Sequence, residues 1–320
     1  MYMPDSLLDC YPQIAVVAHD AGGAEIVSGY IKRNNLHEKC RYSLKGPAIE
    51  IFRNKLDPIN NENITKILAQ CDCLFSATSW DSTHEFEAIR KAKELGIKTI
   101  AFLDHWVNYG QRFIRRGDEV LPEDIWVSDE YGFEIAKNIF GEKIHSIQIV
   151  ENPYLAEANF MLEEAEKKIA LSKEIVTSNN ALFLSEAISE HAMKVYGNER
   201  YWGYTQLEAF QYFIENIDAL GIKIKKIRIR PHPAESVEKF LGVLEKYQFR
   251  IEISFSSTLW EDIAWSKIVV GCSSMGMVAS LASKRRVVCV IPPQGGLCKL
   301  PQTEIELLTK IIEQGKGKNV

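Results

Sequence analysis

A histidine between two prolines is the chain's clearest candidate for chemistry. His232 follows Lys226–Arg230, in which isoleucine and arginine alternate as they do along a β-strand. The flanking prolines end that strand, because proline has no amide hydrogen for a sheet, and a helix is expected from 234–238. Ligands of open α/β sheets bind just beyond the carboxyl ends of the strands. His232 and Arg230 are therefore suited to an anionic group, and a rigid turn with a solvated histidine is the alternative.

A second strand end in the same half carries small and hydroxyl side chains. The apolar run Lys267–Val270 leads directly into Gly271–Gly276, which includes Ser273 and Ser274. Backbone amides and serine hydroxyls at such a strand-to-helix turn can hold a phosphate, whereas an ordinary serine helix cap is the alternative. The spacing is not that of a P-loop. Two such turns in one half favour a phosphate site shared with His232.

In the N-terminal half, the first strand also ends in a polar turn. The apolar run Ile14–Ala18 leads into His19 and Asp20, and then into Gly22 and Gly23. The two glycines permit close backbone approach, and the amides at the start of the following helix favour an anion or a carboxylate. Asp20 is either the N-terminal cap of that helix or a catalytic base at the mouth of the first strand.

Another strand end places an acid beside a histidine. Asp104 is followed by His105 after the run 99–103, which suggests either an acid/base pair or a capped turn. The segment 109–119 is expected to be a loop, solvated or mobile near a cleft. Three arginines of this loop are candidate cations for an anionic substrate: Arg112, Arg115 and Arg116.

Composition indicates an ordinary soluble globular protein. The chain has 320 residues, enough for two domains, with 46% hydrophobic and 25% charged residues. Its net charge of −5 argues against a nucleic-acid partner. The seven cysteines are scattered and lack zinc spacing, so they are expected to be reduced and the protein cytoplasmic. No signal peptide is expected at Met1–Asp5 and no membrane span at 268–282.

Strands alternate with helices along the chain, which predicts two parallel, doubly wound, Rossmann-like sheets. A boundary is expected in the charged helix and polar linker of residues 155–180, between an N-terminal domain, 1–154, and a C-terminal domain, 181–320. A capping box at Thr205–Glu208 opens one helix of the second domain. Expected strands are 14–18, 73–77, 99–103, 125–127, 147–150, 181–184, 226–230, 250–253, 267–270 and 287–291, and a closing helix is expected at 303–314.

Two doubly wound halves, with phosphate-type turns in the second, resemble the GT-B glycosyltransferases, whose two domains face a central cleft. Within that fold the chain is similar to bacterial sialyltransferases and polysialyltransferases. The similarity covers mainly residues 181–291. It consists of the His-Pro motif Arg230–Pro233, the serine pair Ser273-Ser274, and Leu182–Glu186 with Gly203–Thr205 downstream.

The resemblance implies a transferase that moves a nonulosonic (sialic-type) acid from a CMP-activated donor to a glycan or glycolipid acceptor in surface polysaccharide synthesis. It implies that His232 and the serine pair contact the donor phosphate and sugar, and that an N-terminal carboxylate is the general base. Asp20 is the nearest match to the family's acidic motif, and Asp104 is the reserve. Donor contacts are expected from Arg230, Ser273, Ser274, Gly22, Gly23, Ser185 and Glu186.

No metal or cofactor is expected, because no two aspartates have D-x-D spacing. His-Pro turns and paired serines also occur in teichoic-acid polymerases that use CDP-polyol donors, and UDP-sugar 2-epimerases share the fold. A non-catalytic nucleotide-sugar-binding protein is a further alternative. Basic residues of 223–230 suggest either a solvated strand edge or peripheral contact with the inner face of a membrane. The oligomeric state is left open.

Overall fold

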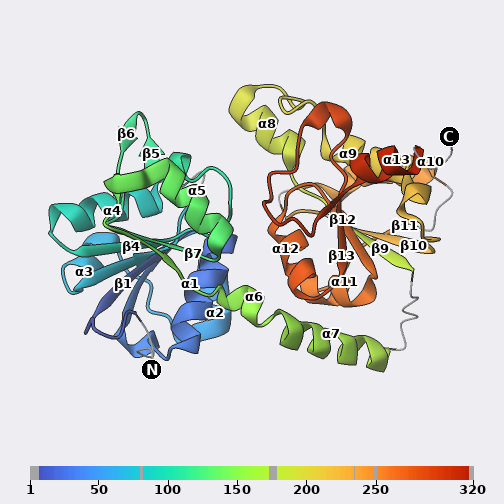
Figure 1. Cartoon of the computed structure of the whole chain (residues 1–320). Helices are drawn as coiled ribbons and strands as arrows, with labels where there is room; N and C mark the ends of the chain where they lie inside the picture. Colours follow the sequence, from blue (N-terminus) through green and yellow to red (C-terminus); the bar gives the residue numbers. More distant parts are fainter. Residues whose placement is uncertain (1–6, 80–81, 173–178, 234, 248–250, 317–320) are drawn as a thin grey trace. The chain divides into compact units, whose positions relative to one another are not determined.

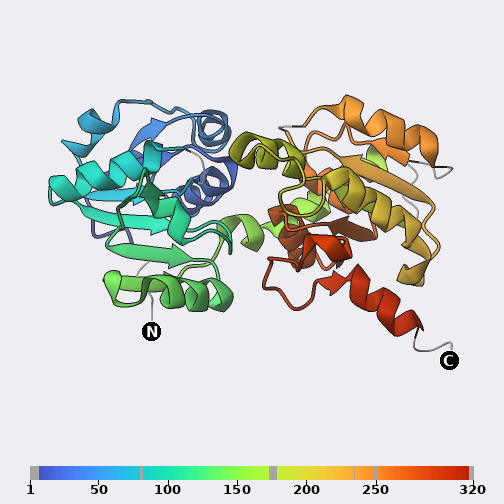
Figure 2. The ribbon, with the colours of Figure 1, turned by 90° about the horizontal axis from the view of Figure 1, so that it is seen from above.

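The computed structural model describes residues 7–79, 82–172, 179–233, 235–247 and 251–316. The chain folds into two compact units, Met1–Ala156 and Glu157–Val320. Each unit is a parallel β-sheet with helices on both faces, as Figures 1 and 2 show. Among the described residues, none of the helices has the length and apolar character needed to cross a membrane. The roles of the two domains, and a cleft between them, stay predictions.

The first unit is built on a six-stranded sheet in the order β2-β1-β3-β4-β7-β8, with every neighbouring pair parallel. A separate antiparallel hairpin joins β5 and β6. The strands are β1 Ile14–Ala18, β2 Cys40–Leu44, β3 Cys73–Ser76, β4 Lys98–Phe102, β5 Ile114–Arg115, β6 Asp118–Glu119, β7 Asp124–Val127 and β8 Ser146–Ile149. The helices are α1 Ala21–Arg33, α2 Ala48–Leu56, α3 Ile64–Leu68, α4 His84–Glu94, α5 Glu130–Phe140 and α6 Pro153–Ala156.

Strand β1 explains why this sheet is covered on both faces. All five of its residues are buried. Val16 belongs to a core shared with Ile26 of α1, whereas Val17 belongs to a second core shared with Ile89 of α4. Because alternate side chains of a strand point to opposite faces, a continuous apolar run needs helices on both sides. The Val-rich run therefore fixes β1 in the centre of a three-layer unit.

The second unit repeats this architecture with the sheet order β11-β10-β9-β12-β13-β14, again all parallel. In chain order this is 3-2-1-4-5-6, the order of a Rossmann sheet. The strands are β9 Asn180–Leu184, β10 Lys226–Arg230, β11 Ile251–Ile253, β12 Ile268–Gly271, β13 Arg286–Cys289 and β14 Glu306–Leu307. The helices are α7 Ala158–Ser172, α8 Ile188–Tyr196, α9 Gln206–Glu215, α10 Leu241–Lys246, α11 Leu259–Trp265, α12 Met275–Ala282 and α13 Leu308–Lys316.

Phenylalanines of α9 fill one face of this second sheet. Phe210 and Phe213 are fully buried against Phe183 of β9 and Ile229 of β10, and the two rings of Phe183 and Phe210 meet edge to face at 4.9 Å. The predicted capping box is present, since Thr205 and the third helical residue bond each other's backbone amides. On the chain's way into this unit, α7 packs against α11 and α12.

Three expectations about local structure are wrong. The loop expected at 109–119 contains the hairpin β5–β6, because Arg116 and Gly117 both take positive φ angles of 54° and 89°, as a type I′ hairpin turn requires. The helix expected from 234–238 begins as a 3-10 turn at Val237, and Ala234 lies outside the described residues. The closing helix begins later than expected, after the short strand β14.

Candidate functional site

The switch point of the second sheet lies between β9 and β12. From β9 the chain moves outward to β10 and β11, and it then crosses back to β12 on the other side of β9. A crevice forms outside the carboxyl ends of two strands whose connections diverge in this way. Ser185 and Glu186 follow β9, and Ser273 follows β12. The fold therefore brings three residues predicted from sequence to one edge of one sheet.

The Glu186 side chain lies across this crevice. It accepts hydrogen bonds from the backbone amides of Cys272 and Ser273, at 3.0 and 2.7 Å. Burial raises the pKa of Glu186 to about 7, although these amides favour the charged form. Amides expected to meet a phosphate are thus bound to a carboxylate of the chain itself. Next to them, the buried hydroxyl oxygen of Ser274 has no hydrogen-bond partner in the described part of the chain.

A second buried carboxylate, that of Glu235, connects the ends of β9 and β10. It accepts from the backbone amide of His232 at 2.6 Å and from Ser185 Oγ at 2.9 Å. It also accepts from Gln206 Nε2 at 3.0 Å and forms an ion pair with Lys239 Nζ at 2.5 Å. This side chain fixes the His-Pro turn against the strand end beside it. Sequence reasoning missed Glu235, since an acid two residues after a proline has no distinctive spacing.

The His232 side chain lies at the surface of this edge. The residue is exposed, yet neighbouring atoms desolvate the ring enough to lower its pKa, against the opposing effects of Glu235 and Glu190. Arg230, expected beside it as a phosphate contact, directs Nη1 to the buried Asp262 Oδ2 at 2.6 Å. Its role towards a ligand stays a prediction.

The first unit presents a polar cluster at its own switch point, between β1 and β3. Asp20 follows β1, and its Oδ2 accepts from Ser79 Oγ, after β3, at 2.8 Å. Its Oδ1 lies 2.7 Å from His19 Nδ1. Asp20 occupies the N-cap position of α1, but its side chain makes no capping hydrogen bond. A carboxylate aligned by a hydroxyl and an imidazole is instead suited to exchange protons.

Glu85, in the first turn of α4, is the residue of this cluster that sequence reasoning missed. It is only 3% exposed, and neither carboxylate oxygen has a side-chain hydrogen-bond partner among the described residues. Burial raises its pKa to about 7, with a further contribution from the charge of Asp20. Acids in the first turn of a helix are common because they complement the helix dipole, so the sequence carried no signal for this one.

Asp104, the reserve base, is bound within the first unit by an arginine of the β5–β6 region. Arg112 Nη1 lies 2.5 Å from Asp104 Oδ1 and 2.8 Å from Thr78 Oγ1. Arg112 is 9% exposed, and Arg115 donates to the carbonyl oxygens of Ser79 and Ser82 at 2.9 and 2.8 Å. The expected loop cations 112 and 115 are therefore structural partners within this unit.

The glycines after Asp20 allow the start of α1 to approach neighbouring strand ends. A Cβ at Gly22 would collide with Oδ2 of Asp104, and a Cβ at Gly23 would lie 2.8 Å from the Cβ of Ala77. Atoms this close cannot be tolerated without displacement. In this structure the glycines serve packing against β3 and β4. A donor contact by Gly22 or Gly23, as expected from sequence, stays a prediction.

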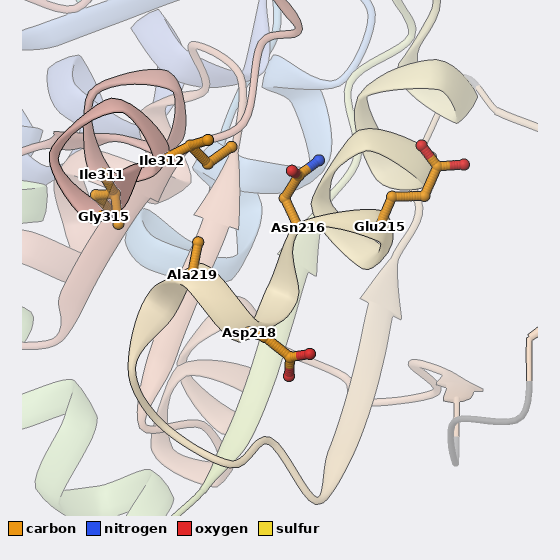
Figure 3. A pocket seen from close by; sticks show the side chains of 7 residues that line it. All are labelled: Glu215, Asn216, Asp218, Ala219, Ile311, Ile312 and Gly315. Atoms are coloured by element: carbon orange, nitrogen blue, oxygen red, sulfur yellow. The ribbon is translucent and has the colours of Figure 1, made fainter. Parts of the chain in front are cut away.

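The second unit also has a cavity, whose lining side chains Figure 3 shows. It is bounded by the end of α9, by the 3-10 turn Ile217–Leu220 and by the last turns of α13. In a parallel α/β unit, helices end where the next strand begins, so this cavity lies beyond the amino ends of the strands. It is lined by Glu215, Asn216, Asp218, Ala219, Ile311, Ile312 and Gly315. It is separate from the switch point.

Several solved structures share the fold of the whole chain. S. aureus MnaA, in a co-structure with UDP, matches with a TM-score of 0.61 at 8% identity over 95% of this chain and 87% of that one. UDP-GlcNAc 2-epimerase from Methanocaldococcus jannaschii matches with 0.60 at 14% identity over 94% and 92%. The wall teichoic acid polymerase TagF matches with 0.52 at 13% identity over 97% and 80%. No protein-family model and no curated protein matches the chain.

At these identities the likeness shows the fold alone. Two Rossmann-like domains, each with a six-stranded parallel sheet, form a fold of GT-B type, and the fold prediction is confirmed. None of the three matches is named as a sialyltransferase. The CMP and sialyl specificity expected from the sequence therefore receives no support from the comparisons.

Proposed function

We propose that the chain is an enzyme that acts on a UDP-linked sugar and that its second unit binds the nucleotide diphosphate. The observation that carries this proposal is the turn between β12 and α12, whose amides at Cys272 and Ser273 hold the acidic group of Glu186 at the switch point. An acidic group on those amides supports the proposal, because a phosphate would use the same hydrogen bonds. The UDP found with S. aureus MnaA supports the choice of nucleotide.

Binding of a diphosphate would require Glu186 to release the turn. The Glu186 carboxylate and a diphosphate are both negatively charged. Their repulsion makes simultaneous binding to the same amides unfavourable. Because the pKa of Glu186 is raised to about 7 by burial, the carboxyl can take up a proton near neutral pH and weaken its hold. The hydroxyl of Ser274, which has no hydrogen-bond partner among the described residues, would then donate to a phosphate oxygen.

Among reactions of UDP-sugars we favour epimerisation, in which a proton leaves a sugar carbon and a proton returns. Such a reaction needs an ionised and a protonated group together. The first unit offers this combination in Asp20, aligned by Ser79 and His19, and in Glu85, whose pKa near 7 leaves it partly protonated. UDP-GlcNAc 2-epimerases among the matching structures support this choice.

Sugar transfer is the second candidate, from a CMP-linked nonulosonic acid to a glycan or glycolipid. The exposed His232, whose backbone amide is held at the strand end by Glu235, favours it, since an imidazole at the surface there can meet a leaving phosphate. Asp20 would then take the proton of the acceptor hydroxyl while the acceptor oxygen forms its bond to the sugar. Polyol-phosphate transfer from a CDP donor, as a TagF-like fold suggests, is distinguished by the nucleotide that binds.

A thermal-shift titration with UDP, CMP, CDP and GDP tests the proposal. UDP is expected to give the largest rise in melting temperature. A ligand that binds only the folded state stabilises it, by about 2.7 kcal/mol at 100 times its Kd. Removing both hydroxyls, in Ser273→Ala with Ser274→Ala, is expected to reduce the shift by at least half. The control is Ser257→Ala, an exposed serine that bonds only Glu261 among the described contacts.

Preference for CMP in this titration would favour nonulosonic transfer, and preference for CDP would favour polyol-phosphate transfer. Binding without turnover of any UDP-, CMP- or CDP-linked donor would favour the non-catalytic alternative. Equal shifts for the double variant and the control would contradict a phosphate at the turn.

A further inference from the structure

Three cysteines meet at the carboxyl ends of β12 and β13. The Sγ atom of Cys289, the last residue of β13, donates to the carbonyl oxygen of Cys272 at 3.2 Å. The Sγ atom of Cys298, in the loop that follows, reaches the same oxygen at 3.5 Å. Cys272 and Cys289 are buried, whereas Cys298 is partly exposed. One carbonyl oxygen therefore brings a buried and an accessible sulfur together.

The shared acceptor places the sulfurs of Cys289 and Cys298 near each other. A hydrogen bond from Cys289 lowers the pKa of Cys298 to about 7 against the opposing effect of burial, and the Leu300 amide and the Ser273 hydroxyl add to the lowering. The same contact, together with burial, raises the pKa of Cys289. The pair thus consists of an accessible sulfur with thiolate character and a neighbouring thiol that keeps its proton.

Cys272 is excluded as the partner by its side-chain position. Its thiol is fully buried and hydrogen-bonds with Tyr204, and burial raises its pKa well above the ordinary value. The hydrogen bonds that the other two sulfurs make with Cys272 go to its backbone oxygen. The geometry leaves one combination with an accessible sulfur, Cys298 with Cys289.

We propose that Cys298 and Cys289 form a peroxide-reactive thiol pair that closes to a disulfide. The Cys298 thiolate attacks one oxygen of hydrogen peroxide, the O–O bond breaks, and hydroxide leaves, so sulfur is oxidised to a sulfenic acid as the peroxide is reduced. The Cys289 sulfur then attacks the Cys298 sulfur. The S–S bond forms, the S–O bond breaks, and water leaves with the Cys289 proton.

Closure of this pair would act on the turn at the switch point. Formation of the disulfide removes the Cys289 thiol hydrogen, which points to the buried carbonyl oxygen of Cys272. The adjacent residue of the loop, Lys299, donates its amide to Ser273 Oγ at 3.4 Å. Movement of Cys298 is therefore transmitted to the turn that holds Glu186. A consequence for nucleotide binding rests on the function proposed above, whereas the oxidation itself does not.

Mass spectrometry after limited peroxide treatment tests the pair. The experiment uses the full chain with Cys10→Ser, which removes the exposed thiol. Both sulfurs lie in one tryptic peptide, Val287–Lys299, which is expected to become lighter by two hydrogens and to resist alkylation until dithiothreitol is added. Cys71 is the internal control, because burial raises its pKa to about 11, and its peptide is expected to react at least ~100-fold more slowly.

Two variants separate the steps of the reaction. Cys298→Ser is expected to leave Cys289 reduced, and Cys289→Ser is expected to leave a Cys298 sulfenic acid that dimedone traps. Oxidation of Cys298 no faster than that of Cys71 would overturn the proposal. So would a cross-link between the Cys298 peptide and a peptide that contains Cys272. The measurement on the Cys10→Ser chain keeps both sulfurs of the pair, so a folding defect in either pair variant leaves the test intact.

The effect on the switch point is measured separately, as UDP affinity before and after oxidation. At least a ~5-fold weaker affinity that dithiothreitol restores is expected if the turn binds the diphosphate. Disulfide formation without a change in UDP affinity would contradict an effect of the disulfide on the turn. It would not contradict the proposed thiol pair. Absence of UDP binding in both forms would contradict the proposed function alone.

Discussion

Asp262→Ala is expected to lower the free energy of unfolding of the second unit by about 3–5 kcal/mol, the typical cost of breaking a buried ion pair from one side. The side chain has no exposed surface. Its oxygens accept from Arg228 Nη1 at 3.3 Å, Arg230 Nη1 at 2.6 Å, Ser254 Oγ at 2.6 Å and Ser256 Oγ at 2.8 Å. The substitution would leave two guanidinium groups near the end of β10 without this counter-charge.

The matched control is Glu252→Ala, which removes the more exposed carboxylate partner of Arg228. A partly exposed ion pair contributes little, so a change of about 1 kcal/mol or less is expected. Urea unfolding followed by peptide-resolved hydrogen exchange reads the two units separately. An equal loss of unfolding free energy in the two variants would show that Asp262 is not needed to balance the charges of Arg228 and Arg230.

Glu85→Gln is expected to stabilise the first unit by about 3 kcal/mol at pH 8. The pKa of this carboxyl is raised from 4.5 to about 7 in the folded chain by burial, and each pKa unit corresponds to about 1.4 kcal/mol. Between these two values the folded state binds more protons than the unfolded state, so stability falls as the pH rises from 4.5 to 7 and stays low above that. Glutamine retains the shape and has no charge to bury.

The difference between wild type and Glu85→Gln is therefore expected to shrink on acidification and to disappear near pH 4. Glu87→Gln on the same helix is the control. The pKa of Glu87 is lowered by its hydrogen bond with Arg90, so its substitution is expected to destabilise slightly at pH 8. Thermal unfolding at pH 4, 6 and 8 measures both. A Glu85→Gln variant that is less stable than wild type at pH 8 would contradict a destabilising buried charge at this position.

If Glu85 also carries the proton in catalysis, the same variant gains stability and loses activity. Natural active sites often retain a destabilising charge for this reason. A stable, inactive Glu85→Gln would support the assignment of Glu85 as the acid beside Asp20. A stable variant with full activity would leave Asp20 to act without it.

The sheets were predictable because their signals are local. Runs such as Ile14–Ala18 and Ile268–Val270 are apolar throughout, and only a strand covered on both faces accommodates them. Turn residues then marked the carboxyl ends, which is why Asp20, His232 and Ser273 could be placed after their strands. The hairpin after Phe113 was missed because an arginine, Arg116, takes a left-handed conformation that glycine or asparagine usually signals.

Partners far apart in the sequence were not predictable. Glu186 bonds amides that are 86 and 87 residues away, and only the order of the strands brings them together. Glu85 gains its character from burial beside Asp20, which no spacing in the sequence expresses. The convergence of Cys289 and Cys298 on one carbonyl oxygen likewise depends on the path of a loop.

Hydrogen–deuterium exchange with saturating UDP tests the central claim most directly, because it reports where the diphosphate binds. The proposal predicts slower exchange of the amides at Cys272, Ser273 and Ser274. For the residues that line the cavity between α9 and α13, it predicts faster exchange or no change. It also predicts altered exchange at Ser185 and Glu186 as the carboxylate leaves the turn. Protection confined to other segments, with the 272–274 amides unchanged at saturation, would contradict a nucleotide site at the switch point of the second sheet.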